Sequence, residues 1–124
     1  MSKKAILVDI HNTSLDENGK INQNLYDMIK TISKDYLILL ITARYYANIE
    51  AFHTDIKSIA NIAKATFYNS NTNYKKDSEI KEYIYKEQIA GLYDVKLVID
   101  NSKNCCKMFK QNGIDTLRYK NKGI

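Results

Sequence analysis

The chain of 124 residues contains no proline, only two cysteines and no long hydrophobic run. Proline usually makes up about 5% of residues, so its absence predicts few rigid loops. The longest apolar run, Leu37 to Ile41, is far shorter than the roughly 18–20 residues that a membrane-spanning helix needs. The first apolar run, Ala5 to Val8, is shorter than the apolar segment of a signal peptide, about 7–15 residues. These absences argue against membrane and secreted proteins and predict a cytoplasmic one.

The two cysteines, Cys105 and Cys106, are neighbours in the sequence. Adjacent residues on a helix point about 100° apart, so a disulfide between them would be strained. No cysteine or histidine has the spacing of a zinc finger, which argues against structural zinc. We therefore expect both cysteines to be packing residues in a reducing compartment.

The net charge of +5 at pH 7 comes entirely from the C-terminal part of the chain. Residues 1–102 contain 13 basic and 13 acidic side chains, whereas residues 103–124 contain six basic side chains against Asp115 alone. One interpretation is a solvated helix face followed by a tail. The other is a contact for a phosphate-rich partner.

Short apolar runs alternate with segments of helical periodicity along the whole chain. A hydrophobic content of 44% and a charged content of 27% are typical of a globular protein, and the length predicts one domain over residues 1–124. The runs expected to form strands are Ala5–Val8, Leu37–Ile41, Thr66–Tyr68, Val95–Ile99 and Thr116–Tyr119. Five strands with four intervening helices predict an α/β fold: a Rossmann-like three-layer sandwich around a five-stranded, mostly parallel sheet.

Four segments are expected to be helices. Leu25, Met28, Ile29 and Ile32 share one helix face, and the same spacing runs from Ile49 to Ala63. A less periodic helix is expected from Ile80 to Ile89, with Asp77 or Ser78 as its cap. Cys105, Met108 and Phe109 form the apolar face of the last expected helix, with Ser102 as its N-cap and Gly113 as the residue that ends it.

Polar side chains follow three of the predicted strands. Asp9, Thr42 and Asp100 each come directly after an apolar run. In an open parallel sheet, ligands bind at the carboxyl ends of the strands, so these side chains are expected to converge. Lys75 and Lys76 precede the third helix at the same edge. Two carboxylates, a hydroxyl and a lysine suit Mg²⁺ binding and phosphoryl transfer through an aspartyl-phosphate.

These residues fall in the order of the four motifs of haloacid dehalogenase (HAD) superfamily phosphatases. The chain resembles most closely the 3′-phosphatase domain of phage-type polynucleotide kinase/phosphatase. The quoted segments are Val8-Asp9-Ile10-His11-Asn12-Thr13, Thr42-Ala43-Arg44, Lys75-Lys76-Asp77, Ile80-Lys81-Glu82, Tyr93 to Asp100 and Gly113-Ile114. The resemblance covers nearly the whole chain and implies a HAD-like fold, with the host cytoplasm as its location if the chain is phage-encoded.

The resemblance also implies a role for each motif residue. Asp9 would be the nucleophile and a Mg²⁺ ligand, and Asp100 and the backbone carbonyl of His11 would complete the protein's share of the coordination. Thr42 would donate to a phosphoryl oxygen, and Lys76 or Lys75 would neutralise phosphate charge. Substrate contacts are assigned to Arg44, Thr13, Lys75 and Tyr45, the last of which, like Tyr46, is a candidate to stack on a base.

Two positions depart from the family pattern. His11 stands where the family has a second aspartate as acid/base, and Asn101 stands where a second acid often follows Asp100. Histidine is itself a general acid/base, so a Mg²⁺-dependent phosphohydrolase acting on a nucleotide or a nucleic-acid 3′-phosphate is the first hypothesis. The second is a binding module that has lost hydrolysis and sequesters a phosphorylated nucleotide, for example as a phage sponge for a host nucleotide signal.

The predicted connections leave no room for a cap domain. Family members that act on small molecules usually carry a cap after the first or third strand, whereas the gaps here hold 12 residues or fewer. A capless site is open to a large substrate such as a nucleic-acid end. It can also be closed by a neighbouring subunit, so we expect a homo-oligomer.

Overall fold

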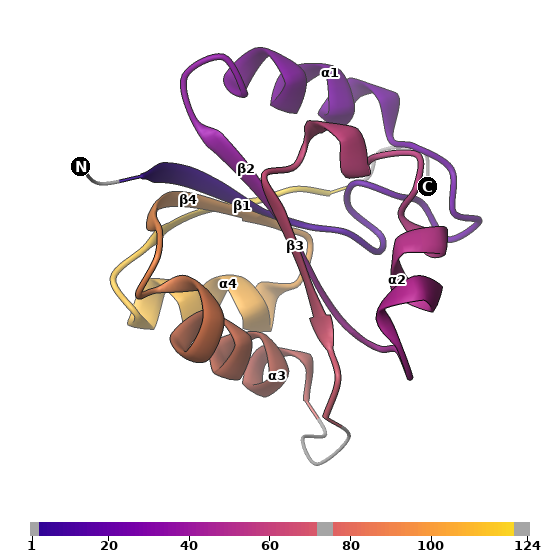
Figure 1. Ribbon diagram of the computed structural model, residues 1–124. Coiled ribbons are helices and arrows are strands. Elements are labelled where there is room, and N and C mark those ends of the chain that lie inside the picture. The colour runs from indigo at the N-terminus through magenta and orange to yellow at the C-terminus, as the bar shows by residue number, and fades with distance from the viewer. Residues whose placement is uncertain (1–2, 72–75, 121–124) are drawn as a thin grey trace.

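A three-layered α/β arrangement is seen in the computed structural model, which describes residues 3–71 and 76–120 (Figure 1). The middle layer is a five-stranded sheet with the strand order β3-β2-β1-β4-β5, in which every neighbouring pair is parallel. The strands are β1 (Lys4–Asp9), β2 (Leu37–Tyr45), β3 (Ala65–Asn69), β4 (Asp94–Asp100) and β5 (Asp115–Arg118). The predicted fold class is confirmed.

Two helices cover each face of the sheet. The first pair is α1 (Gln23–Ile32) and α2 (Ile49–Asp55), and the second is α3 (Asp77–Ile84) and α4 (Lys103–Gln111) (Figure 1). Two hydrophobic clusters fill the space between the layers, one under each pair. Within residues 3–71 and 76–120, every helix is too short or too polar to cross a bilayer.

Strand alternation decides which way the acidic strand ends point. On β1, Ile6 and Val8 pack in the cluster under α1 and α2, whereas Ala5 and Leu7 pack in the cluster under α3 and α4. Because side chains alternate along a strand, Asp9 shares the face of Leu7. On β4, Val98 belongs to the same cluster as Leu7, so Asp100 faces α3 and α4 as well.

The helix predicted from Ile49 to Ala63 is shorter than expected. It ends at Asp55 and is followed by turns that include a 3-10 helix, Ala60–Ile62. Isoleucine, threonine and serine are weaker helix formers than alanine or leucine, and this segment is rich in them. Ile56 and Ile59 nevertheless reach the core, with at most 1% of either exposed. Consecutive turns thus satisfy the apolar spacing that had predicted one long helix.

The helix predicted from Ile80 to Ile89 also differs. It begins at Asp77, with Lys76 rather than Asp77 or Ser78 as its cap, and it changes after Ile84 into a π-helical turn, Tyr85–Ile89. The backbone N–H of Ala90 donates to the carbonyl of Tyr85, five residues back. This wider turn brings both Ile84 and Ile89 into the core, which explains the irregular periodicity of the sequence.

The fourth helix follows the prediction closely. The Ser102 side chain accepts a hydrogen bond from the backbone N–H of Cys105, and Gly113 follows the helix with a φ of +82°. Cys105 and Cys106 are both buried and free, as packing residues should be.

Candidate active site

The carboxyl ends of three central strands meet at one edge of the sheet. The register pairs Val8 with Ile99 on β4 and Asp9 with Ile41 on β2, so Asp100 and Thr42 follow directly beside Asp9. A cleft of about 300 Å³ opens at this edge. It is lined by Asp9, His11, Asn12, Thr42, Ala43, Arg44, Asp77, Lys81, Asp100, Asn101 and Ser102.

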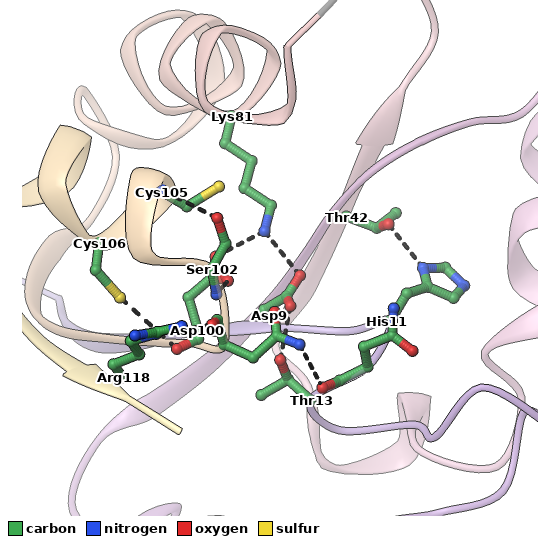
Figure 2. Close-up of polar contacts among 12 residues, drawn as sticks. Asp9, His11, Thr13, Thr42, Lys81, Asp100, Ser102, Cys105, Cys106 and Arg118 are labelled. Carbon is green, nitrogen blue, oxygen red and sulfur yellow. Dashed lines mark hydrogen bonds and ion pairs between the residues drawn. The ribbon is translucent and has the colours of Figure 1, made fainter. Parts of the chain in front are cut away.

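A buried lysine joins the two carboxylates. Lys81 extends from α3, and its Nζ lies 2.8 Å from Oδ1 of Asp9 and 2.6 Å from Oδ2 of Asp100 (Figure 2). All three side chains are almost fully buried, with 3–4% of Lys81 and Asp9 exposed and none of Asp100. A buried charge is costly unless it is paired, so these three groups depend on one another.

The charges in this array do not cancel. Burial alone would lower the pKa of Lys81, but the charges of Asp9 and Asp100 outweigh burial and raise it above its ordinary value. Burial raises the pKa of Asp9 to about 6; Lys81 opposes this change, while Asp100 adds to it. Two carboxylates share one ammonium group, so one negative charge is left over in a buried site.

The remaining carboxylate oxygens also have donors. The Thr13 hydroxyl donates to Oδ2 of Asp9 at 2.7 Å, and the backbone N–H of Ser102 donates to Oδ1 of Asp100 at 2.9 Å. The Ser14 hydroxyl donates to the backbone carbonyl of Asp9 at 2.7 Å. Asp9 is therefore positioned from two sides: Thr13 and Ser14 in the turn after β1 donate to it, and Lys81 on α3 forms an ion pair with it.

His11 is tied through both of its ring nitrogens. Nδ1 lies 2.7 Å from the hydroxyl oxygen of Thr42 (Figure 2), and Nε2 lies 3.2 Å from the hydroxyl oxygen of Tyr46. The Tyr46 hydroxyl donates to Asp55 at 2.6 Å. Burial lowers the pKa of His11 to about 4, and the nearby Arg44 charge adds to the effect. The imidazole is therefore neutral at pH 7, and one of its two ring nitrogens carries no hydrogen.

Of the predicted site residues, five line this cleft: Asp9, His11, Thr42, Arg44 and Asp100. Thr13 does not, because it is fully buried behind Asp9, which makes it a support for that carboxylate rather than a substrate contact. Tyr45 is 48% exposed on β2 and lies outside the cleft lining.

The lysine in contact with the carboxylates differs from the expected one. Lys76 caps α3 with its side chain exposed, and Lys75 lies outside the described residues. Lys81 was missed because a lysine inside a helix normally marks the solvent face. The available signal was its position one residue after Ile80 and three before Ile84, both of which are core residues. That spacing puts Lys81 on the inner side of α3.

The donor set suits a hard divalent cation. Among the residues that the structure describes, no three histidine, cysteine or acidic side chains gather, and the two carboxylates that lie on either side of Lys81 are those of Asp9 and Asp100. Their oxygens are the ligand type that Mg²⁺ prefers, and each oxygen can accept a second contact beside its present donor. The unbalanced negative charge favours a cation as well, so the residues fit Mg²⁺.

The fold and this site agree with a known family. A family model described as the polynucleotide kinase PNKP phosphatase domain matches residues 3–122. The chain therefore belongs to the family of PNKP phosphatase domains, within the HAD superfamily. A search of the curated proteins gave no significant match.

Solved structures show the same fold. Two structures of Pnkp1/Rnl/Hen1 complexes, one of them described as an RNA repair complex, match with TM-scores of 0.83 and 0.77 at 19% identity. The matches cover 97% and 99% of this chain but only 47% and 44% of those chains, so this chain spans less than half their length. A hydrolase from Streptococcus pneumoniae TIGR4 matches with a TM-score of 0.54 at 17% identity, over 82% of this chain and 53% of that one.

Proposed function

We propose that this phosphatase-type domain removes a 3′-phosphate from a nucleotide or a nucleic-acid end through an aspartyl-phosphate, with Mg²⁺ as its cofactor. The observation that carries the proposal is the buried array of Asp9, Lys81 and Asp100 at the floor of a cleft. A buried carboxylate that is ionised at neutral pH although burial has raised its pKa is typical of a catalytic group. Membership of the PNKP phosphatase family supports the substrate class.

The chain's own residues account for both steps of such a hydrolysis. An oxygen of Asp9 attacks phosphorus, the bond to the leaving oxygen breaks, and the leaving oxygen takes a proton from water. Water then attacks the aspartyl-phosphate, the bond from phosphorus to Asp9 breaks, and the proton lost by that water is taken up by the hydrogen-bonded pair of Thr42 and neutral His11. Lys81 stabilises the charges around Asp9, and Arg44, half exposed at the rim of the cleft, can bind a phosphoryl oxygen.

Mg²⁺ would be held by Asp9, Asp100 and the backbone carbonyl of His11. A bound divalent cation neutralises phosphoryl charge and orients the reacting groups. The protein supplies the two carboxylates already facing each other across Lys81.

The first test is phosphate release across a panel of 3′- and 5′-phosphorylated nucleotides and oligonucleotides. We expect turnover of the 3′-phosphates in Mg²⁺ and none after chelation of the metal. A protein that is free of contaminating phosphatase and releases no phosphate from any member of the panel contradicts the proposal. Tight retention of a nucleotide without product, measured by calorimetry, would instead favour the binding module, which the family match does not favour.

A basic stripe on α4 supports a polymer as the substrate. Lys103, Lys107 and Lys110 are exposed at helical spacing, and α4 carries no acidic residue. The helix begins beside the cleft, because Asn101 and Ser102 line the cleft. Arg118 lies at the same edge and donates from Nε to the carbonyl of Asn101. We propose that the stripe, defined by the three lysines, binds phosphates of the strand that leads to the 3′ end.

Charge reversal on the stripe tests this contact. The double substitution Lys107→Glu and Lys110→Glu should raise KM several-fold for a 3′-phosphorylated oligonucleotide at low salt, and should weaken the salt dependence of KM. KM for a 3′-mononucleotide should not change, because it is too short to reach α4.

The matched control for the stripe is Lys30→Glu with Lys34→Glu. Both lysines are exposed on the other face of the sheet, Lys30 in the last turn of α1 and Lys34 in the turn just after it, and the change in net charge is the same. Equal effects of the two double variants on KM would mean that the net charge of the protein, rather than the position of the stripe, changes KM.

The expected homo-oligomer stays a prediction.

A further inference from the structure

A chain of hydrogen bonds runs from the cleft to the protein surface. It connects Thr42 to His11 at 2.7 Å, His11 to Tyr46 at 3.2 Å, and Tyr46 to Asp55 at 2.6 Å. Tyr46 is nearly buried, with 8% exposed, and its ring packs against those of Phe52 and Tyr68. The position of the Tyr46 hydroxyl is therefore fixed by the core beneath α2.

The outer end of the chain sets the direction of every bond in it. Asp55 also lies 3.7 Å from the Arg44 guanidinium, a partner for its negative charge. An ionised carboxylate only accepts, so the single hydroxyl proton of Tyr46 points to Asp55. The Tyr46 oxygen is then left as an acceptor for His11, and Nε2 must carry a hydrogen. A neutral imidazole has one N–H, so Nδ1 is the acceptor for the Thr42 hydroxyl.

We propose that Tyr46 and Asp55 are positioning residues that hold His11 as the tautomer with hydrogen on Nε2, so that Nδ1 accepts the hydrogen bond of the Thr42 hydroxyl. The mutual orientation of the ring and of Thr42 follows from the same bonds. The sequence pattern predicts no role for Asp55, and for Tyr46 it predicts only stacking on a base of the substrate.

This tautomer has a consequence for the second step of hydrolysis, and that consequence rests on the proposed function. Water attacks the phosphorus of the aspartyl-phosphate and gives its proton to Thr42, while Thr42 passes its own hydroxyl proton to Nδ1 of His11. The imidazolium that forms keeps its Nε2–H bond to Tyr46, and Asp55 balances the new charge through Tyr46. The proton later leaves His11 for solvent, and the phosphorus–Asp9 bond breaks to release phosphate.

The tautomer can be measured without any enzymatic activity. Ring nitrogen NMR on ¹⁵N-histidine-labelled protein at pH 7.5, with His53 as the second histidine and internal reference, distinguishes a protonated from an unprotonated nitrogen. We expect hydrogen on Nε2 of His11 in the wild type. In Asp55→Ala, Tyr46 loses its acceptor and can donate to Nε2, so the hydrogen should move to Nδ1.

Asp27→Ala is the matched control, because Asp27 is an exposed acid on α1 whose side chain accepts one hydrogen bond, from Gln23. It should leave the His11 signals unchanged. Hydrogen on Nδ1 in the wild type, or identical His11 signals in Asp55→Ala and Asp27→Ala, would overturn the proposal.

A kinetic measurement connects the tautomer to the reaction. In Tyr46→Phe the ring packing is kept but Nε2 loses its partner, so hydrolysis of the aspartyl-phosphate should slow by about tenfold or more, whereas its formation should not. Rapid-quench measurement of acid-stable, hydroxylamine-labile phosphoprotein should then show accumulation. Equal slowing of both steps would contradict the positioning role. If no protein variant releases phosphate while the NMR result is as expected, the proposed function fails and the tautomer assignment stands.

Discussion

Lys81→Met should nearly abolish phosphate release and also destabilise the metal-free protein. Methionine retains most of the volume of the lysine stem but removes the charge that lies between Asp9 and Asp100. Loss of one electrostatic group from an active site costs on the order of 10²- to 10³-fold in rate. Removal of one partner from a buried ion pair costs about 3–5 kcal/mol, because the other charge is left without compensation. Steady-state kinetics and thermal unfolding measure the two effects.

The loss of stability in Lys81→Met should depend on pH. The pKa of Asp9 is already raised to about 6, and without Lys81 it rises further. At pH 5, Asp9 takes up a proton and relieves the repulsion, so the destabilisation should be smaller than at pH 8. Lys86→Met is the matched control, because the Lys86 side chain is 58% exposed and its ion pair with Glu82 lies at the surface. Full activity in Lys81→Met would refute the role given to this lysine.

Asp9→Asn should lose all phosphate release and yet be more stable than the wild type at pH 8 without metal. The first effect follows because an amide is no nucleophile. The second follows because the ordinary pKa of 3.8 is raised to about 6 in the folded protein. A raised pKa favours folding at low pH, and this contribution is lost as the pH rises through about 6. The difference between the two values corresponds to roughly 3 kcal/mol at pH 8.

The asparagine fits the site chemically. Its carbonyl oxygen can accept from Lys81, and its amide can donate to the Thr13 oxygen, because a hydroxyl both donates and accepts. Lys81 would then be paired with Asp100 alone, and the excess charge would be gone. Thermal unfolding of both proteins at pH 5 and pH 8, with and without Mg²⁺, provides the comparison. The stability gain should be roughly halved at pH 5, because the unfolded-state carboxyl of Asp9 is still ionised there, and should vanish only below its ordinary pKa of 3.8. Mg²⁺ should stabilise the wild type more than the variant.

The opposite result is equally informative about Asp9. If Asp9→Asn is less stable than the wild type at pH 8 in the absence of metal, the ionised carboxylate of Asp9 stabilises the folded protein and its pKa is not raised by folding. The same variant would still be expected to release no phosphate.

Most of the fold was predictable because it depends on short-range patterns. Apolar runs became strands near their predicted bounds, and Ser102 and Gly113 delimit α4 as expected. The failures came where tertiary contacts replaced regular structure. Ile56 and Ile59 reach the core through turns, and the π-helical turn after Ile84 changes the helix phase by one residue. Periodicity alone cannot distinguish these solutions from a regular helix.

The candidate site divides in the same way. Asp9, Thr42 and Asp100 could be placed together because parallel strands end at one edge, which is a rule of topology. Lys81 could not be chosen over Lys76, since the choice depends on which side of α3 faces the sheet. The roles of Thr13 and Asp55 depend on how two turns close and where a tyrosine ring packs. Such contacts are set by three-dimensional packing rather than by spacing.

The sequence distance between the members of the charged array has a consequence for how the protein is made. Lys81 is 72 residues from Asp9 and 19 residues from Asp100. A ribosome-bound chain that has emerged only as far as β3 exposes the β1 carboxylate with neither its lysine nor its second carboxylate. Such a nascent chain cannot yet bind the cation between two acids. The complete charged array therefore forms only once β4 has paired with β1, when the chain has emerged at least as far as Asp100.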